Sequence, residues 1–205
     1  MNIRIADRVI VFDYGEVISV SQSAADRAAL VDLSGLDPRL FWQLYERYRD
    51  DLDQGVTLPR EYWNLIAGDA GVEWSPAQLQ QLWAADIRSW ISVDPGTVQL
   101  LAELHAGGTR IALLSNAGFD FSDPFRYSPM ADFFEAIFVS AELGLIKPDP
   151  EIYQVTAREL GIELDQMVFI DNKKINVDAA TALGVTGHVF TAVAELRVFL
   201  ESLAS

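Results

Sequence analysis

The chain has no cysteine and only two histidines among its 205 residues. Without cysteine, the sequence excludes a disulfide framework, a thiolate nucleophile and a cysteine-ligated zinc site. His105 and His188 lie far apart in the sequence, which argues against a histidine-rich metal site. Long hydrophobic runs are absent as well: no segment reaches membrane-spanning length, and the N-terminal residues lack the apolar stretch of a signal peptide. We therefore expect a soluble, cytoplasmic protein.

Positive charge is scarce in this sequence. The Lys and Arg residues number 15 against 30 Asp and Glu residues, which gives a formal net charge of −15 at pH 7. This sign opposes binding to nucleic acid and docking on anionic membranes, so neither partner is expected. Hydrophobic residues make up 50% of the chain, enough to bury one sizeable core with a smaller appended lobe.

Apolar runs alternate with capped helical patterns, most clearly after about residue 94. The pairs Asp94-Pro95 and Asp149-Pro150 each predict the start of a helix. The strands show little internal polar alternation, so both faces of the sheet should be covered. A parallel, Rossmann-like three-layer α/β core is therefore expected. Apolar runs predict its strands at residues 8–12, 111–114, 136–140, 167–170 and 187–190.

Residues 20–92 show helical patterns and no convincing strand. Asp37-Pro38 predicts the start of one continuous amphipathic helix that ends at Gly55. Further helices are expected near residues 58–67 and from residue 75 to residue 90. An all-helical insert after the first strand suggests a lid over the strand ends. The predicted domains are a core of residues 1–19 and 93–205 and an α-helical cap of residues 20–92.

Asp13 directly follows the first apolar run, and three later loops carry further polar side chains. These are Ser115-Asn116 after the second strand, Lys147 before the helix that begins at Pro150, and Asp171-Asn172 after the 167–170 strand. In parallel sheets, ligands bind beyond the carboxyl ends of the strands. Taken alone, each residue fits an ordinary turn, helix cap or surface position. Their joint order at successive loops favours a shared site.

Four segments in this order resemble the haloacid dehalogenase-like (HAD) hydrolase superfamily, in its branch with a helical cap after the first strand. The segments are Val-Ile-Val-Phe-Asp-Tyr-Gly-Glu-Val at 9–17, Leu-Leu-Ser-Asn-Ala at 113–117, Gly-Leu-Ile-Lys-Pro-Asp-Pro-Glu-Ile-Tyr at 144–153, and Phe-Ile-Asp-Asn with Asn-Val-Asp-Ala-Ala at 169–180. The likeness extends over nearly the whole chain. It implies a HAD-like fold, in agreement with the core and cap expected above.

The resemblance implies a Mg²⁺-dependent phosphatase that hydrolyses a small phosphorylated metabolite, with sugar phosphates among the candidates. Asp13 would attack phosphorus and form an aspartyl-phosphate, which water would then hydrolyse. Mg²⁺ prefers hard oxygen ligands, which Asp13, the backbone carbonyl of Gly15 and Asp171 would supply. The cation is needed because a carboxylate and a phosphate dianion repel one another.

The remaining matched positions would bind the phosphoryl group or support the site. Lys147 would act as a catalytic point charge on the transferring group and on Asp13. The Ser115 hydroxyl and the Asn116 backbone N–H would donate to phosphoryl oxygens. Asn172 would accept from a metal-bound water, and Asn176 would orient the loop that carries it.

The chain departs from most phosphatases of the superfamily at two positions. Gly15 stands where they carry an Asp that serves as general acid and base, a role typically worth about 10²–10⁴-fold in rate. The Asp-x-Gly pattern looks closest to glucose-1-phosphate phosphatase-like members, whose substrate has a good leaving group. Glu16 is displaced by one residue and is expected to point elsewhere. Asn172 replaces an acid found in many relatives, so metal binding should be weaker.

Two alternatives remain beside the phosphatase. A non-catalytic or regulatory binder of phosphorylated ligands would keep the fold without the acid. A 2-haloacid dehalogenase would use Asp13 on carbon without a metal, but Gly15-Glu16-Val17 differs from the Tyr-Gly-Thr typical of that branch. Periodicity does not identify which cap arginine among Arg39, Arg47, Arg49 and Arg60 faces the site. Either a monomer or a homodimer is compatible with the sequence.

Overall fold

The computed structural model describes residues 2–204 of the chain. In this part of the chain, parallel strands form a five-stranded sheet in the order β3-β2-β1-β4-β5. The prediction of a Rossmann-like α/β core is confirmed. The strands are β1 (Val9–Phe12), β2 (Arg110–Ser115), β3 (Ala136–Val139), β4 (Met167–Asp171) and β5 (Thr186–Val189).

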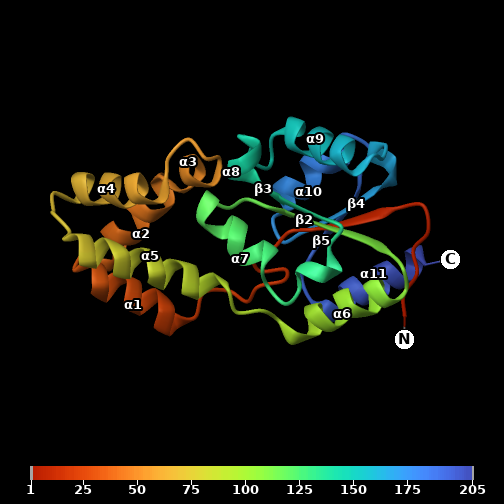
Figure 1. The fold of residues 1–205 in the computed structure, drawn as a ribbon, viewed down its shortest axis with the longest axis horizontal. Helices are drawn as coiled ribbons and strands as arrows, with labels where there is room; N and C mark the ends of the chain where they lie inside the picture. The colour runs from red at the N-terminus through yellow and green to blue at the C-terminus, as the bar shows by residue number, and fades with distance from the viewer. Residues whose placement is uncertain (1, 205) are drawn as a thin grey trace.

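Helices after β2 alternate with the strands. Six helices lie between β1 and β2: α1 to α5 pack beside the sheet rather than over it, and α6 covers one face of the sheet (Figure 1). The helices are α1 (Ala24–Ser34), α2 (Pro38–Arg47), α3 (Arg49–Asp53), α4 (Pro59–Ala70), α5 (Pro76–Trp90), α6 (Pro95–Ala106), α7 (Ser122–Arg126), α8 (Ser140–Leu143), α9 (Pro150–Leu160), α10 (Lys174–Thr181) and α11 (Val193–Leu203). Short 3-10 helices occur at Phe119–Phe121, Ala131–Phe133 and Leu164–Gln166.

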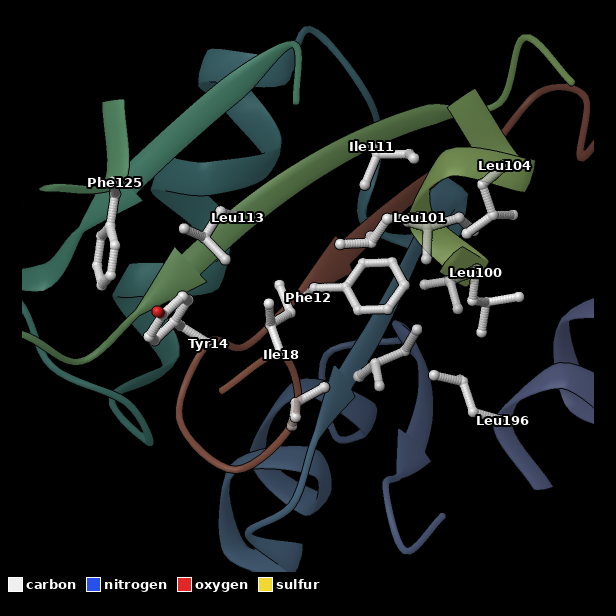
Figure 2. Close-up of a cluster of buried hydrophobic side chains, with 14 of the residues drawn as sticks. Phe12, Tyr14, Ile18, Leu100, Leu101, Leu104, Ile111, Leu113, Phe125 and Leu196 are labelled. Carbon is white, nitrogen blue, oxygen red and sulfur yellow. The ribbon is translucent and has the colours of Figure 1, made fainter. Parts of the chain in front are cut away.

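Strand β1 lies at the centre of the sheet, and its side chains are fully buried on both faces. Ile10 and Phe12 belong to one cluster with leucines of α6 and α11, where Figure 2 shows Phe12 among them. Val9 and Val11 belong to the opposite cluster with residues of α9 and α10. Burial of each such side chain contributes about 1.5–3 kcal/mol. Two-sided burial explains why this strand is a continuous apolar run.

The insert between β1 and β2 has its own apolar cluster and one element that differs from the prediction. We expected a single helix from Pro38 to Gly55, but the chain leaves helical geometry at Tyr48 (φ −105°, ψ 2°), which separates α2 from α3. The apolar periodicity continues across this break, because Tyr45 and Leu52 are both buried in the same cluster. Periodicity therefore indicated the buried face but did not reveal the interruption.

The tip of this helical insert is seated against α8. Gly55 has a φ of +77°, and a Cβ there would lie 2.5 Å from the carbonyl oxygen of Ala141, so only glycine fits. The Ser140 hydroxyl donates to the carbonyl oxygen of Asp53 and accepts a 2.8 Å hydrogen bond from the backbone N–H of Ala117. One hydroxyl therefore joins the insert to the loop that follows β2.

The two connections to the insert run side by side, because Ser19 and Val93 form an isolated antiparallel bridge. The division into a core (1–19 and 93–205) and a cap (20–92) remains a prediction. Across residues 2–204, no helix has both the length and the apolar character that a membrane crossing requires.

Candidate active site

Three predicted site residues lie at the ends of adjacent strands, at one edge of the sheet. Strand β1 pairs with β2 on one side and with β4 on the other, so Asp13, Ser115 and Asp171 all stand at the same carboxyl edge. The Asp13 backbone N–H donates to the carbonyl oxygen of Ile170 at 2.8 Å, which extends the pairing to the acidic residue itself.

Lys147 reaches this edge from the loop between α8 and α9. Its ammonium nitrogen lies 2.7 Å from Oδ1 of Asp13, 2.8 Å from Oδ2 of Asp171 and 2.9 Å from the carbonyl oxygen of Leu114. The side chains of Lys147 and Asp171 are 1% and 0% exposed, whereas that of Asp13 is 11% exposed. One cation therefore bridges two carboxylates, and only the Asp13 carboxylate faces open space.

Asp13, Lys147 and Asp171 form a buried triad, and their pKa values are shifted by burial and by the excess of negative charge. Burial raises the pKa of the Asp13 carboxyl to about 6, because Lys147 offsets it only in part and the neighbouring Asp171 raises it further. Burial disfavours the charged form of Lys147, but the two carboxylates outweigh this effect and raise its pKa. Additional positive charge at the site would favour the ionised form of Asp13 that acts as a nucleophile.

The Asp171 carboxylate is fixed by the loop and helix that follow it. Its Oδ1 accepts a 2.7 Å hydrogen bond from the Lys173 backbone N–H, and its Oδ2 accepts a 2.9 Å bond from the Asn176 side chain. The Tyr153 hydroxyl donates to the Asn176 carbonyl oxygen at 2.9 Å, which ties α9 to this turn.

The Asn116 side chain has a contact that the sequence reading missed. Its amide nitrogen donates to the carbonyl oxygen of Lys147, and its amide oxygen accepts from the backbone N–H of Lys147, both at 2.9 Å. This reciprocal pair anchors the backbone from which Lys147 extends. The position of Asn116 at a strand end was the only sequence signal, and it did not specify a partner 31 residues away.

A cavity of about 590 Å³ opens above the triad. Its wall on the sheet side includes Asp13, Gly15, Ser115, Asn116, Lys147, Asn172 and Asn176, which are all of the predicted site residues except the fully buried Asp171. The helical insert contributes Gln22, Arg27, Tyr45, Glu46, Arg49, Asp50, Asp53 and Trp90. The predicted residues are therefore brought together in one place.

Arg49 is the one of the four candidate arginines that lines the cavity. Its guanidinium pairs with Asp53 at 3.0 Å and with Asp86 at 3.1 Å, and it donates to the Tyr45 hydroxyl at 2.8 Å. Burial raises the pKa of Asp53 to about 7, with Arg49 opposing the shift and Asp86 adding to it. Helical periodicity gave no sign of this network, because its partners come from different helices.

Arg27 also lines the cavity and was not among the arginines considered from the sequence. Its guanidinium carbon lies 3.7 Å from the centre of the Trp42 ring. Stacking of this kind keeps an exposed arginine in one place without neutralising its charge.

Glu16 does not point away from the site, and that expectation was wrong. The residue has a φ of +58°, and its carboxylate accepts a 2.8 Å hydrogen bond from the side-chain nitrogen of Asn172. The left-handed backbone turns this side chain back across the strand ends, a conformation that is uncommon for residues other than glycine. The displacement of Glu16 by one residue from the missing acid therefore did not indicate the direction of its side chain.

The donor set at the strand ends is compatible with a divalent cation. Within residues 2–204, no group of three His, Cys, Asp or Glu side chains gathers as a metal cluster. The carboxylates of Asp13 and Asp171 nevertheless lie near one another, because both pair with the ammonium group of Lys147. In addition, Oδ1 of Asn172 is buried without a hydrogen-bond partner among the described residues. Few carboxylates, one unpartnered oxygen and an adjoining cavity suit Mg²⁺, which usually retains several waters.

Comparison with known proteins gives consistent matches over most of the chain. Residues 8–184 match the family model for haloacid dehalogenase-like hydrolases. The chain is 26% identical over 185 residues to sesquiterpene phosphatase astK of Aspergillus oryzae, a match that covers 88% of each protein. It is 24% identical over 189 residues to D-ribitol-5-phosphate phosphatase of Bacteroides thetaiotaomicron, covering 85% of this chain and 87% of that protein.

Solved structures show the same fold. A HAD family enzyme from Bacteroides thetaiotaomicron, in complex with magnesium and inorganic phosphate, has a TM-score of 0.71 and 22% identity, covering 90% of this chain and 94% of that one. An L-2-haloacid dehalogenase from Xanthobacter autotrophicus has a TM-score of 0.64 and 18% identity, and the match covers 88% of this chain and 76% of that one. The resemblance to glucose-1-phosphate phosphatase-like members stays a prediction. Because the family model spans most of the sequence, this chain belongs to the haloacid dehalogenase-like hydrolase family.

Proposed function

We propose that this hydrolase is a Mg²⁺-dependent phosphatase acting on a small phosphorylated metabolite through an aspartyl-phosphate at Asp13. The observation that carries the proposal is the pair of carboxylates, Asp13 and Asp171, held by the ammonium group of Lys147 beneath an open cavity. Phosphoryl transfer through an aspartyl-phosphate needs a carboxylate nucleophile together with positive charge near the phosphoryl oxygens, and this arrangement supplies both.

In the first step, an Asp13 carboxylate oxygen forms a bond to phosphorus while the bond to the leaving-group oxygen breaks. The leaving oxygen takes a proton from solvent. Water then attacks the phosphorus of the aspartyl-phosphate, the bond to Asp13 breaks, and inorganic phosphate leaves. Lys147 stabilises negative charge in both steps, while the Ser115 hydroxyl and the Asn116 backbone N–H donate to phosphoryl oxygens.

Asp13, Asp171, the Gly15 carbonyl and Asn172 would hold the cation. Bound Mg²⁺ offsets the repulsion between the Asp13 carboxylate and the phosphate dianion. Asn176 acts through Asp171, because its amide fixes one oxygen of that carboxylate.

Relatives support this reaction class. Proteins similar to this chain over most of its length are named as phosphatases of a sesquiterpene and of D-ribitol 5-phosphate, and a structural neighbour binds magnesium and inorganic phosphate. The cavity has room for a leaving group larger than phosphate and mixes carboxylates, amides and aromatic rings. These properties favour a hydroxyl-bearing metabolite such as a sugar phosphate. Substrate choice would then belong to the cap, residues 20–92.

A metabolite panel tests the reaction class. We expect phosphate release from one or more phosphorylated metabolites in Mg²⁺, and loss of that release in excess EDTA, with recovery when Mg²⁺ is restored. The measurement is colorimetric phosphate detection across sugar, polyol, aryl and isoprenoid monophosphates. Undiminished release in EDTA would contradict the metal-assisted scheme. Halide release from 2-haloacids in EDTA would instead identify a dehalogenase, and ligand binding without turnover would identify a regulatory binder.

Gly15→Asp is expected to increase turnover of substrates with poor leaving groups. The backbone φ at Gly15 lies outside the left-handed range, and a Cβ there would be 3.8 Å from Oδ2 of Asp13, an ordinary contact, so the backbone accepts a residue with a Cβ. A carboxyl group at this position supplies the missing acid, and we expect a gain of about tenfold or more on alkyl phosphates, toward the 10²–10⁴-fold typical of general acids.

The matched control for this variant is Gly15→Asn, which has the same size and no acid. Turnover is to be measured for an alkyl phosphate and for an aryl phosphate whose leaving group needs no proton. The gain should be confined to Gly15→Asp and to the alkyl ester. Equal rates in the two variants would show that the missing acid does not limit turnover.

A further inference from the structure

Glu16 occupies an unusual backbone position in the turn after β1. Its φ of +58° is the left-handed conformation, although the residue is not glycine. The turn is closed by backbone hydrogen bonds from Ile18 and Ser19 to the carbonyl oxygen of Tyr14, at 2.9 and 2.8 Å. The Glu16 backbone N–H donates to the Ser19 hydroxyl at 3.1 Å. Strained backbone of this kind persists where the surroundings hold it, often at functional sites.

Both oxygens of the Glu16 carboxylate are engaged. Oε1 accepts a 2.6 Å hydrogen bond from the Ser21 hydroxyl, and Oε2 accepts a 2.8 Å bond from the side-chain nitrogen of Asn172. Glu16 and Asn172 are 156 residues apart in sequence, and both line the cavity above Asp13. The turn after β1 and the turn after β4 are therefore joined through this one contact.

The contact also determines the orientation of the Asn172 amide. A carboxylate only accepts hydrogen bonds, so the amide must present its nitrogen to Glu16. The amide oxygen is then directed away from Glu16, and it is buried without a hydrogen-bond partner among residues 2–204. Buried polar atoms nearly always have a hydrogen-bond partner, so an unpartnered oxygen at the wall of a cavity points to a bound water or ion.

We infer that Glu16 is a positioning residue of the cation site: it holds Asn172 so that the amide oxygen faces the cation or one of its waters. The inference rests on the proposed metal-dependent function. Asn172 contributes no charge to the site, and Glu16 supplies a negative charge at the distance of one hydrogen bond from it. Glu16 and Asn172 therefore act as a matched pair, in which one residue supplies the charge and the other the ligand oxygen.

This pairing makes a reciprocal exchange informative. Asn172→Asp alone places two carboxylates at the distance of the present 2.8 Å hydrogen bond, where they repel one another. Glu16→Gln alone keeps the shape but removes the charge and allows the Asn172 amide to turn. The Glu16→Gln/Asn172→Asp double variant restores one donor, one acceptor and one negative charge, with the carboxylate now on the β4 turn.

The test is direct measurement of cation affinity in the full chain. Mn²⁺ binding is followed by electron paramagnetic resonance, and Mg²⁺ affinity by competition, for the wild type, Glu16→Gln, the double variant and Ser21→Ala. Groups that orient metal ligands typically contribute about 10- to 100-fold in affinity, so we expect a loss in this range for Glu16→Gln. The double variant should recover most of that loss. Ser21→Ala, which leaves the Glu16–Asn172 contact in place, should change affinity by less than about threefold.

Phosphate release separates this role from a catalytic one. At saturating Mg²⁺, Glu16→Gln should retain kcat within a few-fold while needing more Mg²⁺ to reach it. A fall in kcat at saturation with unchanged cation affinity would overturn the inference, as would unchanged affinity in Glu16→Gln or no recovery in the double variant. If wild-type protein releases phosphate without binding Mn²⁺ or Mg²⁺, the proposed metal-dependent function fails as well, which distinguishes the two failures.

Discussion

Asp13→Asn should abolish phosphate release and leave the fold intact. The amide has nearly the same shape as the carboxylate but is not a nucleophile toward phosphorus, so no aspartyl-phosphate forms. Enzymes typically accelerate reactions by about 10⁶-fold or more. Removal of the nucleophile should lower the rate of phosphate release by roughly 10⁴-fold or more. Lys147 still has Asp171 as a buried partner in this variant, which preserves a compensated charge at the site.

Two measurements check this outcome. Steady-state phosphate release gives the loss of rate, and acid quenching with a radiolabelled phosphoryl donor shows whether the protein retains covalent phosphate. The wild type should retain label and Asp13→Asn should not. Asp165→Asn is the matched control, because Asp165 is exposed and lies outside the cavity lining. Wild-type rates in Asp13→Asn would refute the nucleophile assignment.

Lys147→Met should lose both activity and stability. Methionine fills a similar volume without charge, so Asp13 and Asp171 are left close together in a buried site with no cation between them. Removing one partner of a buried ion pair typically costs about 3–5 kcal/mol in the free energy of unfolding. Loss of the charge on the phosphoryl oxygens should reduce turnover by about 10²–10³-fold.

Urea unfolding in EDTA and in Mg²⁺ measures the stability effect. A divalent cation placed between the two carboxylates would replace part of the missing charge, so Mg²⁺ should stabilise Lys147→Met more than it stabilises the wild type. Lys174→Met serves as the control: Lys174 is exposed and pairs with Asp178 on the surface, and its loss should change stability by about 0.5 kcal/mol or less. If Lys147→Met in EDTA is as stable as the wild type, the triad is not held by charge.

The sheet and the site on its edge could be predicted because they depend on short-range features. Two-sided burial makes β1, β2 and β4 continuous apolar runs, and such runs are visible without knowledge of their neighbours. Parallel pairing then brings Asp13 and Asp171 to one edge. Lys147 could be included only through its family motif, since nothing in its immediate surroundings distinguishes it from a surface lysine.

Features that depend on long-range partners could not be predicted. The direction of Glu16 follows from a left-handed φ, which sequence patterns rarely indicate for a glutamate. The ion pair of Arg49 with Asp86 requires α3 and α5 to be packed together, and helical periodicity gives the buried face of each helix without its partner. Helix α1 is not among the helices predicted from the sequence, because its segment shows no clear apolar periodicity.

The Ser140 hydroxyl has a consequence for how the helical insert and the loop after β2 can move. It donates to Asp53 at the tip of the helical insert and accepts from the backbone of Ala117, directly after Ser115 and Asn116. Any lifting of that tip would break the first of these bonds, and the hydroxyl would then have the carbonyl oxygen of Ala117, 3.3 Å away, as its remaining acceptor. The tip of the helical insert and the loop after β2 share this single hydroxyl, so a displacement of either one would change the hydrogen bonding of the other.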